Sequence, residues 1–296
     1  VLMAALGIFR GIFLAVSGSY VMEMANSGEY GKIYGAVQGI SSLLASVGGM
    51  ISGLLYQFKE GEYALYICSF LLIASTLWAA IGLKNNQCMH GERLPILQIF
   101  KSINKRILIF CVLVFIQSFV AGPMWSFIIP MYCYNILLFS PAKLGILMSM
   151  DELIGAPTYM LAGRVVDKVN VVKFNILFLL ITALGGLFLI KSPTPTIFMV
   201  VFLICSVSIS CTFVGIPKER IGFIRKEQKG FELALISVCG SLGDSLGNNV
   251  LGRVAEKYTI DQCMYIFSAS YIVMALLVAL PLLFPHFRFA SGKQEQ

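Results

Sequence analysis

Long apolar stretches, separated by short polar loops, dominate this chain of 296 residues. We find nine such stretches, each about the 20 residues that a helix needs to cross a bilayer. None alternates between apolar and polar positions, and each is far longer than the roughly 9–11 residues of a barrel strand. The pattern predicts an all-α integral membrane protein with transmembrane helices at 2–20, 33–56, 63–83, 107–134, 143–163, 172–190, 196–216, 231–253 and 262–284.

Composition supports a membrane protein and narrows the chemistry. Only 12% of the residues are charged, 58% are hydrophobic and the mean hydropathy is +0.84, whereas soluble domains carry about 25% charge. The net charge of +7 is what cationic loops give a membrane protein, so we expect no nucleic-acid partner. The two histidines, His90 and His286, lie outside the apolar stretches, and no Cys-x-x-Cys pair occurs. We therefore expect no metal site, no cofactor and no histidine-based catalysis.

The distribution of lysine and arginine predicts the orientation. Sixteen of these residues follow the odd-numbered stretches, five follow the even-numbered ones, and Arg10 lies inside the first. Cationic loops stay in the cytoplasm, so we expect a multi-pass protein of the cell membrane with a cytoplasmic C-terminus. Nine spans then place Val1 outside, with no signal peptide before it, and we read the start as truncated.

The chain also contains internal repeats. Shifting the sequence by 199 residues aligns 31–80 with 230–279 and gives twelve identities in 50 positions, against about four by chance for such a composition. Shifting it by 89 residues aligns Gly163–Lys168 with Gly252–Lys257, at opposite sides of the membrane. An inverted repeat nested in a six-helix half is an arrangement of alternating-access transporters. We accordingly divide the chain into three helices of an N-terminal half (1–83), a central cytoplasmic linker (84–106), a complete six-helix half (107–285) and a cytoplasmic tail (286–296).

Short motifs resemble those of the major facilitator superfamily. Gly163, Arg164, Asp167 and Lys168 are similar to its loop signature of a glycine, an acid four residues later and basic residues, although Asn170 replaces the usual second glycine and the later base is displaced to Lys173. Arg10 resembles an arginine of the family's fourth helix, and the glycines at 39, 48, 49 and 53 loosely resemble an antiporter motif of its fifth. The resemblance implies that the nine predicted helices correspond to the last nine of the superfamily's twelve. It also implies a transporter and not an enzyme, with the loop at 163–168 as a gate.

Polar residues inside the apolar stretches are the candidate functional groups. A charge in lipid costs several kcal/mol and is retained mainly where it serves a purpose. The stretches at 63–83, 172–190 and 262–284 carry no charge between their ends, which fits the outer helices of the superfamily. We assign a transport cavity or proton-coupling role to a set drawn from the other stretches: Arg10, Gln117, Trp125, Asp151, Glu152, Asp244 and Asn248. For Asp244 and Glu152 the alternative is a structural hydrogen bond to a neighbouring helix.

Prolines suggest where one helix is interrupted. Gly122, Pro123 and Pro130 lie in the middle of 107–134, and a proline there frees a backbone carbonyl. Broken helices mark the substrate region in many transporters, although proline is also frequent in ordinary membrane helices.

We therefore expect secondary active transport of a small solute by alternating access, with protons as the coupling ion. Symport of a sugar-like or nucleoside-like solute and antiport efflux of an amphipathic compound both remain open. A channel and a membrane-embedded enzyme are the alternatives of another class.

Overall fold

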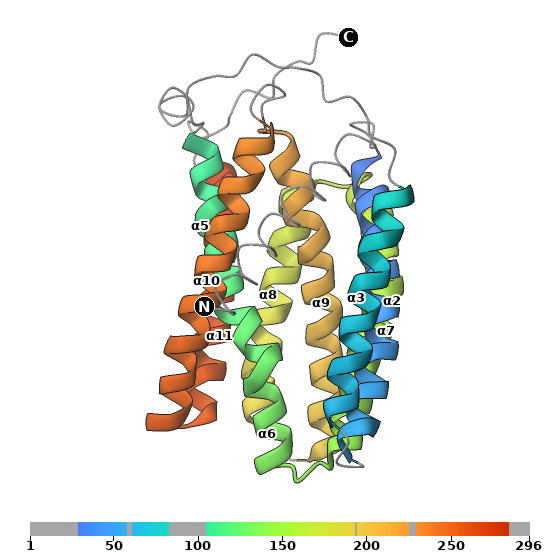
Figure 1. Ribbon diagram of the computed structural model, residues 1–296. Coiled ribbons are helices and arrows are strands. Elements are labelled where there is room, and N and C mark those ends of the chain that lie inside the picture. The colour runs from blue at the N-terminus through green and yellow to red at the C-terminus, as the bar shows by residue number, and fades with distance from the viewer. Residues whose placement is uncertain (1–28, 58–60, 83–104, 193, 225–228, 284–296) are drawn as a thin grey trace.

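The computed structural model describes residues 29–57, 61–82, 105–192, 194–224 and 229–283, and all regular structure in these ranges is helical (Figure 1). The long helices run side by side along one direction, as a membrane bundle requires, because only helices and closed barrels satisfy every backbone group inside lipid. Their bounds are α2 (Tyr30–Gln57), α3 (Gly61–Gly82), α5 (Lys105–Pro123), η1 (Met124–Ile128), α6 (Ile129–Asn135), α7 (Pro141–Val166), α8 (Val171–Ile190), α9 (Pro195–Ile221), α10 (Lys229–Lys257) and α11 (Ile260–Leu283).

Eight of the nine predicted stretches correspond to helices in the described part of the chain, and the first, at 2–20, lies outside it. Among the described residues, five segments are long and apolar enough to cross a membrane: Tyr30–Leu55, Ile107–Asn135, Val171–Ile190, Pro195–Ile221 and Ile260–Leu280. The helices α7 and α10 are as long as these segments, but each carries acids within its length. The all-helical membrane class is confirmed, and the count of nine spans stays a prediction.

The repeats found in the sequence coincide with helix boundaries. Adding 199 to the bounds of α2 and α3 gives 229–256 and 260–281, whereas α10 and α11 occupy 229–257 and 260–283. Adding 89 to the bounds of α7 and α8 gives 230–255 and 260–279, which are again α10 and α11 within four residues. Side-chain identities and helix ends therefore agree on the same periodicity, which supports the division into repeated three-helix units.

The helices pack as a chain of neighbours rather than as one ring. Figure 1 shows α2, α3 and α7 on one side of the bundle and α5, α10 and α11 on the other, with α8 and α9 between them. Aromatic side chains fill the second side and its junction with α9, including Phe198, Phe202, Phe267 and Tyr271, all fully buried. Outward-facing apolar residues such as Leu44 and Phe70 are largely exposed, as expected for side chains that meet lipid.

The helix at 107–134 is interrupted where the prolines predicted. Regular α-helix ends at Pro123 and a π-helical turn follows over Met124–Ile128, before α6 resumes with Pro130 in its first turn. A π-turn inserts an extra residue into the helical ladder and is frequent at functional sites. Trp125 lies inside this turn.

The pairing of α2 with α7 depends on glycine. A Cβ atom on Gly163 would lie 2.2 Å from the carbonyl oxygen of Gly31, and one on Gly53 would lie 2.7 Å from the Cα of Gly145. These two contacts occur near opposite ends of the helices, so the backbones approach closely along their whole length. Small residues permit such an approach in lipid, where dispersion and hydrogen bonds hold helices together. We call this contact the α2–α7 seam.

Candidate functional site

Asp151 is a buried acid in the middle of α7. Ser140 caps the start of this helix by accepting a hydrogen bond from the backbone N–H of Lys143, and Asp151 follows eight residues beyond Lys143, or about 12 Å at the helical rise. Its side chain is 7% exposed. Ser206 on α9 also interacts with this carboxyl group, but the buried Oδ1 atom has no hydrogen bond of ordinary geometry among the described residues. A carboxylate so placed keeps unused capacity for a proton or a cation.

Trp125 holds the other oxygen of this carboxyl group. Its indole Nε1–H donates to Asp151 Oδ2 at 2.9 Å, which joins the π-turn to α7. The indole ring stacks on Phe202 with centroids 5.7 Å apart and packs against Phe267 at 5.9 Å. Aromatic packing on two sides restricts the ring, so the acid is held by a donor with little freedom to move.

Asp244 approaches the same interrupted helix from α10. A Cβ atom on Gly122 would meet the Oδ1 atom of Asp244 at 1.9 Å, so only glycine leaves room for this carboxyl group. Asn248 donates through Nδ2 to the backbone oxygen of Asp244 at 2.9 Å, and the Nδ2–Oδ1 distance is 3.3 Å. Both predicted coupling acids therefore border the segment 122–125, Asp244 at its glycine and Asp151 at its tryptophan. No hydrogen bond between the two acids occurs in the described part of the chain.

Glu152 points to a different neighbour. The Ser42 hydroxyl on α2 lies 3.0 Å from the backbone oxygen of Glu152 and within hydrogen-bond distance of its Oε2 atom. Asp151 contacts residues of η1, whereas Glu152 contacts α2, because consecutive helical side chains point about 100° apart. This contact is of the kind that the alternative for Glu152 predicted, a hydrogen bond to a neighbouring helix.

Two predicted cavity residues remain, Gln117 and Arg10. Gln117 on α5 is 6% exposed, and its Nε2 atom has no hydrogen-bond partner among the described residues. Arg10 lies outside the described residues. No group of three or more His, Cys, Asp or Glu side chains gathers as a metal-ligand set in the ranges that the structure covers.

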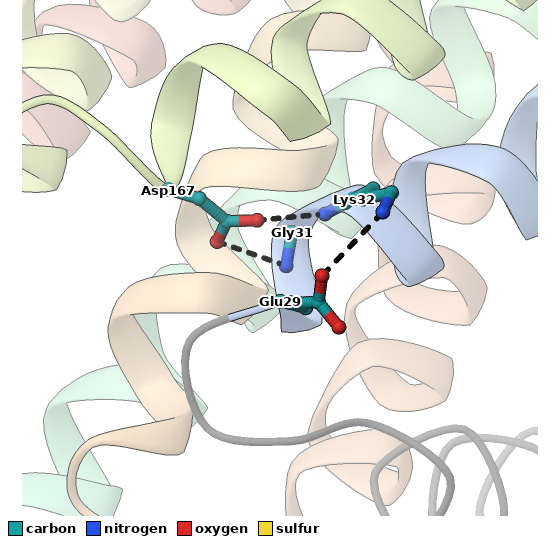
Figure 2. Close-up of polar contacts among 4 residues, drawn as sticks. All are labelled: Glu29, Gly31, Lys32 and Asp167. Atoms are coloured by element: carbon teal, nitrogen blue, oxygen red, sulfur yellow. Dashed lines mark hydrogen bonds and ion pairs between the residues drawn. The ribbon is translucent and has the colours of Figure 1, made fainter.

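The predicted gating loop lies at the end of α7 and meets the start of α2. Figure 2 shows the carboxylate of Asp167 accepting two backbone hydrogen bonds, from Gly31 N at 3.1 Å and Lys32 N at 2.9 Å. These N–H groups belong to the first turn of α2 and have no partner within the helix. A carboxylate at this position caps the helix and complements the positive end of its dipole.

A cation from α9 completes this cluster. Lys218 Nζ lies 2.6 Å from Asp167 Oδ1, and the two side chains are 18% and 12% exposed. The predicted bases Arg164 and Lys168 are exposed, and the charge contact of Asp167 goes to Lys218 instead. These contacts bring the start of α2, the end of α7 and the end of α9 together.

Sequence reasoning missed two contacts made by the predicted site residues. Ser42 and Lys218 each pair with a predicted acid from more than 50 residues away, and one sequence without aligned homologues carries no signal for a specific long-range pair. The serine had appeared in the sequence only as one of the identities between repeats. Lys218 had been counted only as one of the cationic loop residues.

Internal repeats of this kind occur in many membrane transporter folds. The family model described as Major Facilitator Superfamily matches residues 1–248. The chain belongs to this superfamily. Membership confirms the resemblance to the superfamily drawn from the loop signature.

Solved structures share the fold at low sequence identity. A bacterial homologue of the iron transporter ferroportin, in an outward-facing state, matches with 12% identity and a TM-score of 0.62, over 86% of this chain and 65% of its own. The human organic anion transporter MFSD10 (TETRAN) matches with 15% identity and a TM-score of 0.55, over 59% of this chain and 41% of its own. The chain thus spans less than two thirds of either structure. No curated protein is similar enough to match.

Proposed function

We propose that the protein moves a small solute across the cell membrane by alternating access, with the flow of protons as the energy source. The observation that carries the proposal is the carboxyl group of Asp151, which lies buried in α7, a helix that we take to cross the membrane, with one oxygen held by Trp125 and the other without a hydrogen bond among the described residues. An acid in lipid without a paired cation is costly in its charged form and stable in its neutral form. Such a group can bind a proton from one side and release it on the other.

The surroundings of the acid favour a role in conformational change. Trp125 belongs to the π-turn, and Asp244 borders Gly122 just before it. A change of charge on either acid therefore acts on the one interrupted helix of the described chain. π-Turns inside α-helices are frequent at functional sites, and in our proposal protonation and helix geometry are linked at this point.

The cytoplasmic gate is the second part of the proposal. Asp167 ties the start of α2 to the end of α7 and to α9 through Lys218. We assign α2 to the N-terminal half of a twelve-helix transporter and α7 and α9 to the C-terminal half, so these contacts bind the two halves at one end. They would hold this end closed, and their loss would favour opening. The C-terminus and this end lie in the cytoplasm in our assignment.

The solute is not assigned by the fold. The two structural matches are described as an organic anion transporter and as a homologue of an iron transporter, and each description applies to that protein. Uptake of a sugar-like or nucleoside-like solute and antiport of an amphipathic compound both use an acid of this kind.

Transport by the full-length protein in vesicles tests the coupling. Asp151→Asn keeps the shape of the side chain and its acceptor for Trp125 but cannot exchange a proton. We expect this variant to lose accumulation of solute driven by a proton gradient while it keeps exchange between equal pools. Normal accumulation by both Asp151→Asn and Asp244→Asn would refute proton coupling through these acids and favour another ion or uniport. Single-channel currents would instead identify a channel, and turnover of a lipid substrate would identify an enzyme.

A further inference from the structure

The helices α5 and α10 lie side by side (Figure 1) and meet in a regular register. A Cβ atom on Gly243 would lie 2.3 Å from the carbonyl oxygen of Phe115, and one on Gly247 would lie 2.0 Å from that of Phe119. In both pairs the residue numbers differ by 128, and the pairs are four residues apart on each helix. The helices therefore run in the same direction, with residues at intervals of four on the facing sides.

Two cysteines occupy the preceding position of this register. Cys111 lies four residues before Phe115, and Cys239 lies four residues before Gly243, so these two numbers also differ by 128. The side chains of Cys111 and Cys239 interact with each other, as the register requires. Both cysteines are free thiols in the structure. Two thiols from separate helices are thus held face to face.

The space between the helices at this point suits a disulfide bond. In the two glycine pairs the atoms nearest to an added Cβ are backbone, whereas a Cβ atom on Gly240 would meet side-chain atoms, of Val114 at 3.1 Å and of Ser118 at 3.3 Å. Beside Cys239 the helices therefore leave room for side chains between them. A disulfide needs Cα atoms roughly 4.4–6.8 Å apart and Cβ atoms roughly 3.5–4.5 Å apart, which closely packed helices with room for side chains can provide.

We propose that Cys111 and Cys239 form a reversible disulfide bond when hydrogen peroxide is present, and that this bond clamps α5 to α10. Cys239 is partly exposed and Cys111 is 6% exposed, so peroxide reaches Cys239 first. The thiol of Cys239 becomes a sulfenic acid and releases one water. The sulfur of Cys111 then attacks the sulfenic sulfur, the S–S bond forms, and the hydroxyl group leaves with the proton of Cys111 as a second water. The two thiols lose two electrons and two protons, and peroxide takes up both.

The clamp lies beside parts of the molecule that the proposed function requires to move. Asp244 follows Cys239 by five residues, and its carboxyl group fills the space next to Gly122 on α5. Arg220, near the end of α9, interacts with Cys111. In our assignment this end of the bundle is cytoplasmic, where thiols are kept reduced and disulfides are mostly transient and redox-sensing. The pair is therefore a dithiol at rest, and oxidation is the event that fixes the position of α10 against α5.

Peptide mass spectrometry of the full-length protein in lipid nanodiscs tests the site. Wild-type protein is treated with hydrogen peroxide, its remaining thiols are blocked with N-ethylmaleimide, and it is then digested. We expect a peptide pair joined through Cys111 and Cys239 that dithiothreitol separates. The matched control is Cys133→Ser, which removes a cysteine of α6 outside this register and should leave the linked pair unchanged.

Two results would overturn the site. One is recovery of both cysteines with N-ethylmaleimide attached after peroxide treatment. The other is a wild-type digest in which the linked cysteines are a different pair, or in which Cys239 is oxidised further to a sulfinic acid without any link. This measurement uses wild-type protein and involves no solute, so its failure leaves the proposed function untouched.

Hydrogen exchange and transport test the clamp. Oxidation should slow hydrogen exchange of the amides of α5 and α10, and dithiothreitol should restore the original rate. Peroxide should also slow solute exchange in vesicles of the wild-type protein, while Cys111→Ser and Cys239→Ser keep their untreated rates. Linked protein with unaltered hydrogen exchange, or an equal loss of solute exchange in Cys111→Ser, would refute the clamp. If linked protein shows slower hydrogen exchange but the reduced protein moves no solute, the proposed function fails and the clamp stands.

Discussion

Removing the charge of Asp167 perturbs the contact between α2 and α7 with little change in shape. Asp167→Asn keeps one side-chain oxygen, so it can still accept from Gly31 or Lys32 but not from both through equivalent oxygens. It also loses the ion pair with Lys218. The substitution therefore weakens a helix cap and removes a mostly buried charge contact at the same point.

The expected magnitude follows from these contacts. Loss of a good N-cap costs about 0.5–2 kcal/mol, and a hydrogen bond to a charged group contributes about 1.5–3 kcal/mol. Asparagine retains part of the cap and part of the hydrogen bonding, so we expect the closed state to lose roughly 1–3 kcal/mol of stability. The equilibrium constant between the closed and open states should then change about 5–150-fold. The effect should appear in transport rate far more than in the amount of folded protein.

Hydrogen exchange at the first turn of α2 measures this change directly, because the amides of Gly31 and Lys32 are the groups that Asp167 accepts from. Their protection should fall by the factor above. Glu29→Gln is the matched control, since the Lys32–Glu29 pair is 3.4 Å apart with both side chains more than half exposed, and exposed pairs contribute little. Unchanged protection in Asp167→Asn, or an equal loss in Glu29→Gln, would refute the gate. Abundance that falls in step with transport would make Asp167 a structural residue only.

Three further outcomes test the topology, the seam and the site. Substituted-cysteine labelling should reach position Lys168 from inside and Lys143 from outside, and external labelling at 168 would overturn the orientation. Gly163→Ala should reduce the yield of folded protein, because the added Cβ atom would clash with the backbone of Gly31. Gly48→Ala is the control and should not reduce it, because Gly48 has open space around it. Equal yields of the two variants would contradict the seam. Trp125→Phe keeps an aromatic ring but loses the N–H donor, so proton-driven accumulation should fall at unchanged abundance, and normal accumulation would remove the tryptophan from the site.

Much of the fold could be predicted from the sequence because it depends on local, periodic signals. Apolar length predicted the helices, and the 199-residue repeat agrees with the bounds that α2, α3, α10 and α11 have in the structure. Pro123 and Pro130 predicted the interruption at 124–128, since proline removes a backbone donor wherever the helix lies. Each of these signals is carried by a residue and its immediate neighbours.

The site could be predicted only in part, because contacts between distant helices depend on packing. Asp151 stood out as a charge in an apolar stretch, but its bond to Trp125 depends on how α7 packs against the π-turn. The predicted span at 196–216 left Lys218 in a loop with several other cations, whereas α9 extends to Ile221, and nothing in its own neighbourhood distinguished it as the partner of Asp167. The sequence indicated which acids to consider, whereas the side chains that bind them could not be predicted from it.

Solute-driven proton movement tests the central claim most directly. Vesicles that contain the full-length protein and an internal pH dye would be given gradients of sugars, nucleosides and amphipathic ions in turn, with no proton gradient imposed. The account predicts that a transported solute changes the internal pH in wild-type vesicles, and that Asp151→Asn abolishes this change while labelled solute still exchanges. A solute that crosses at the wild-type rate without moving protons, or an unaltered pH change in Asp151→Asn, would contradict it.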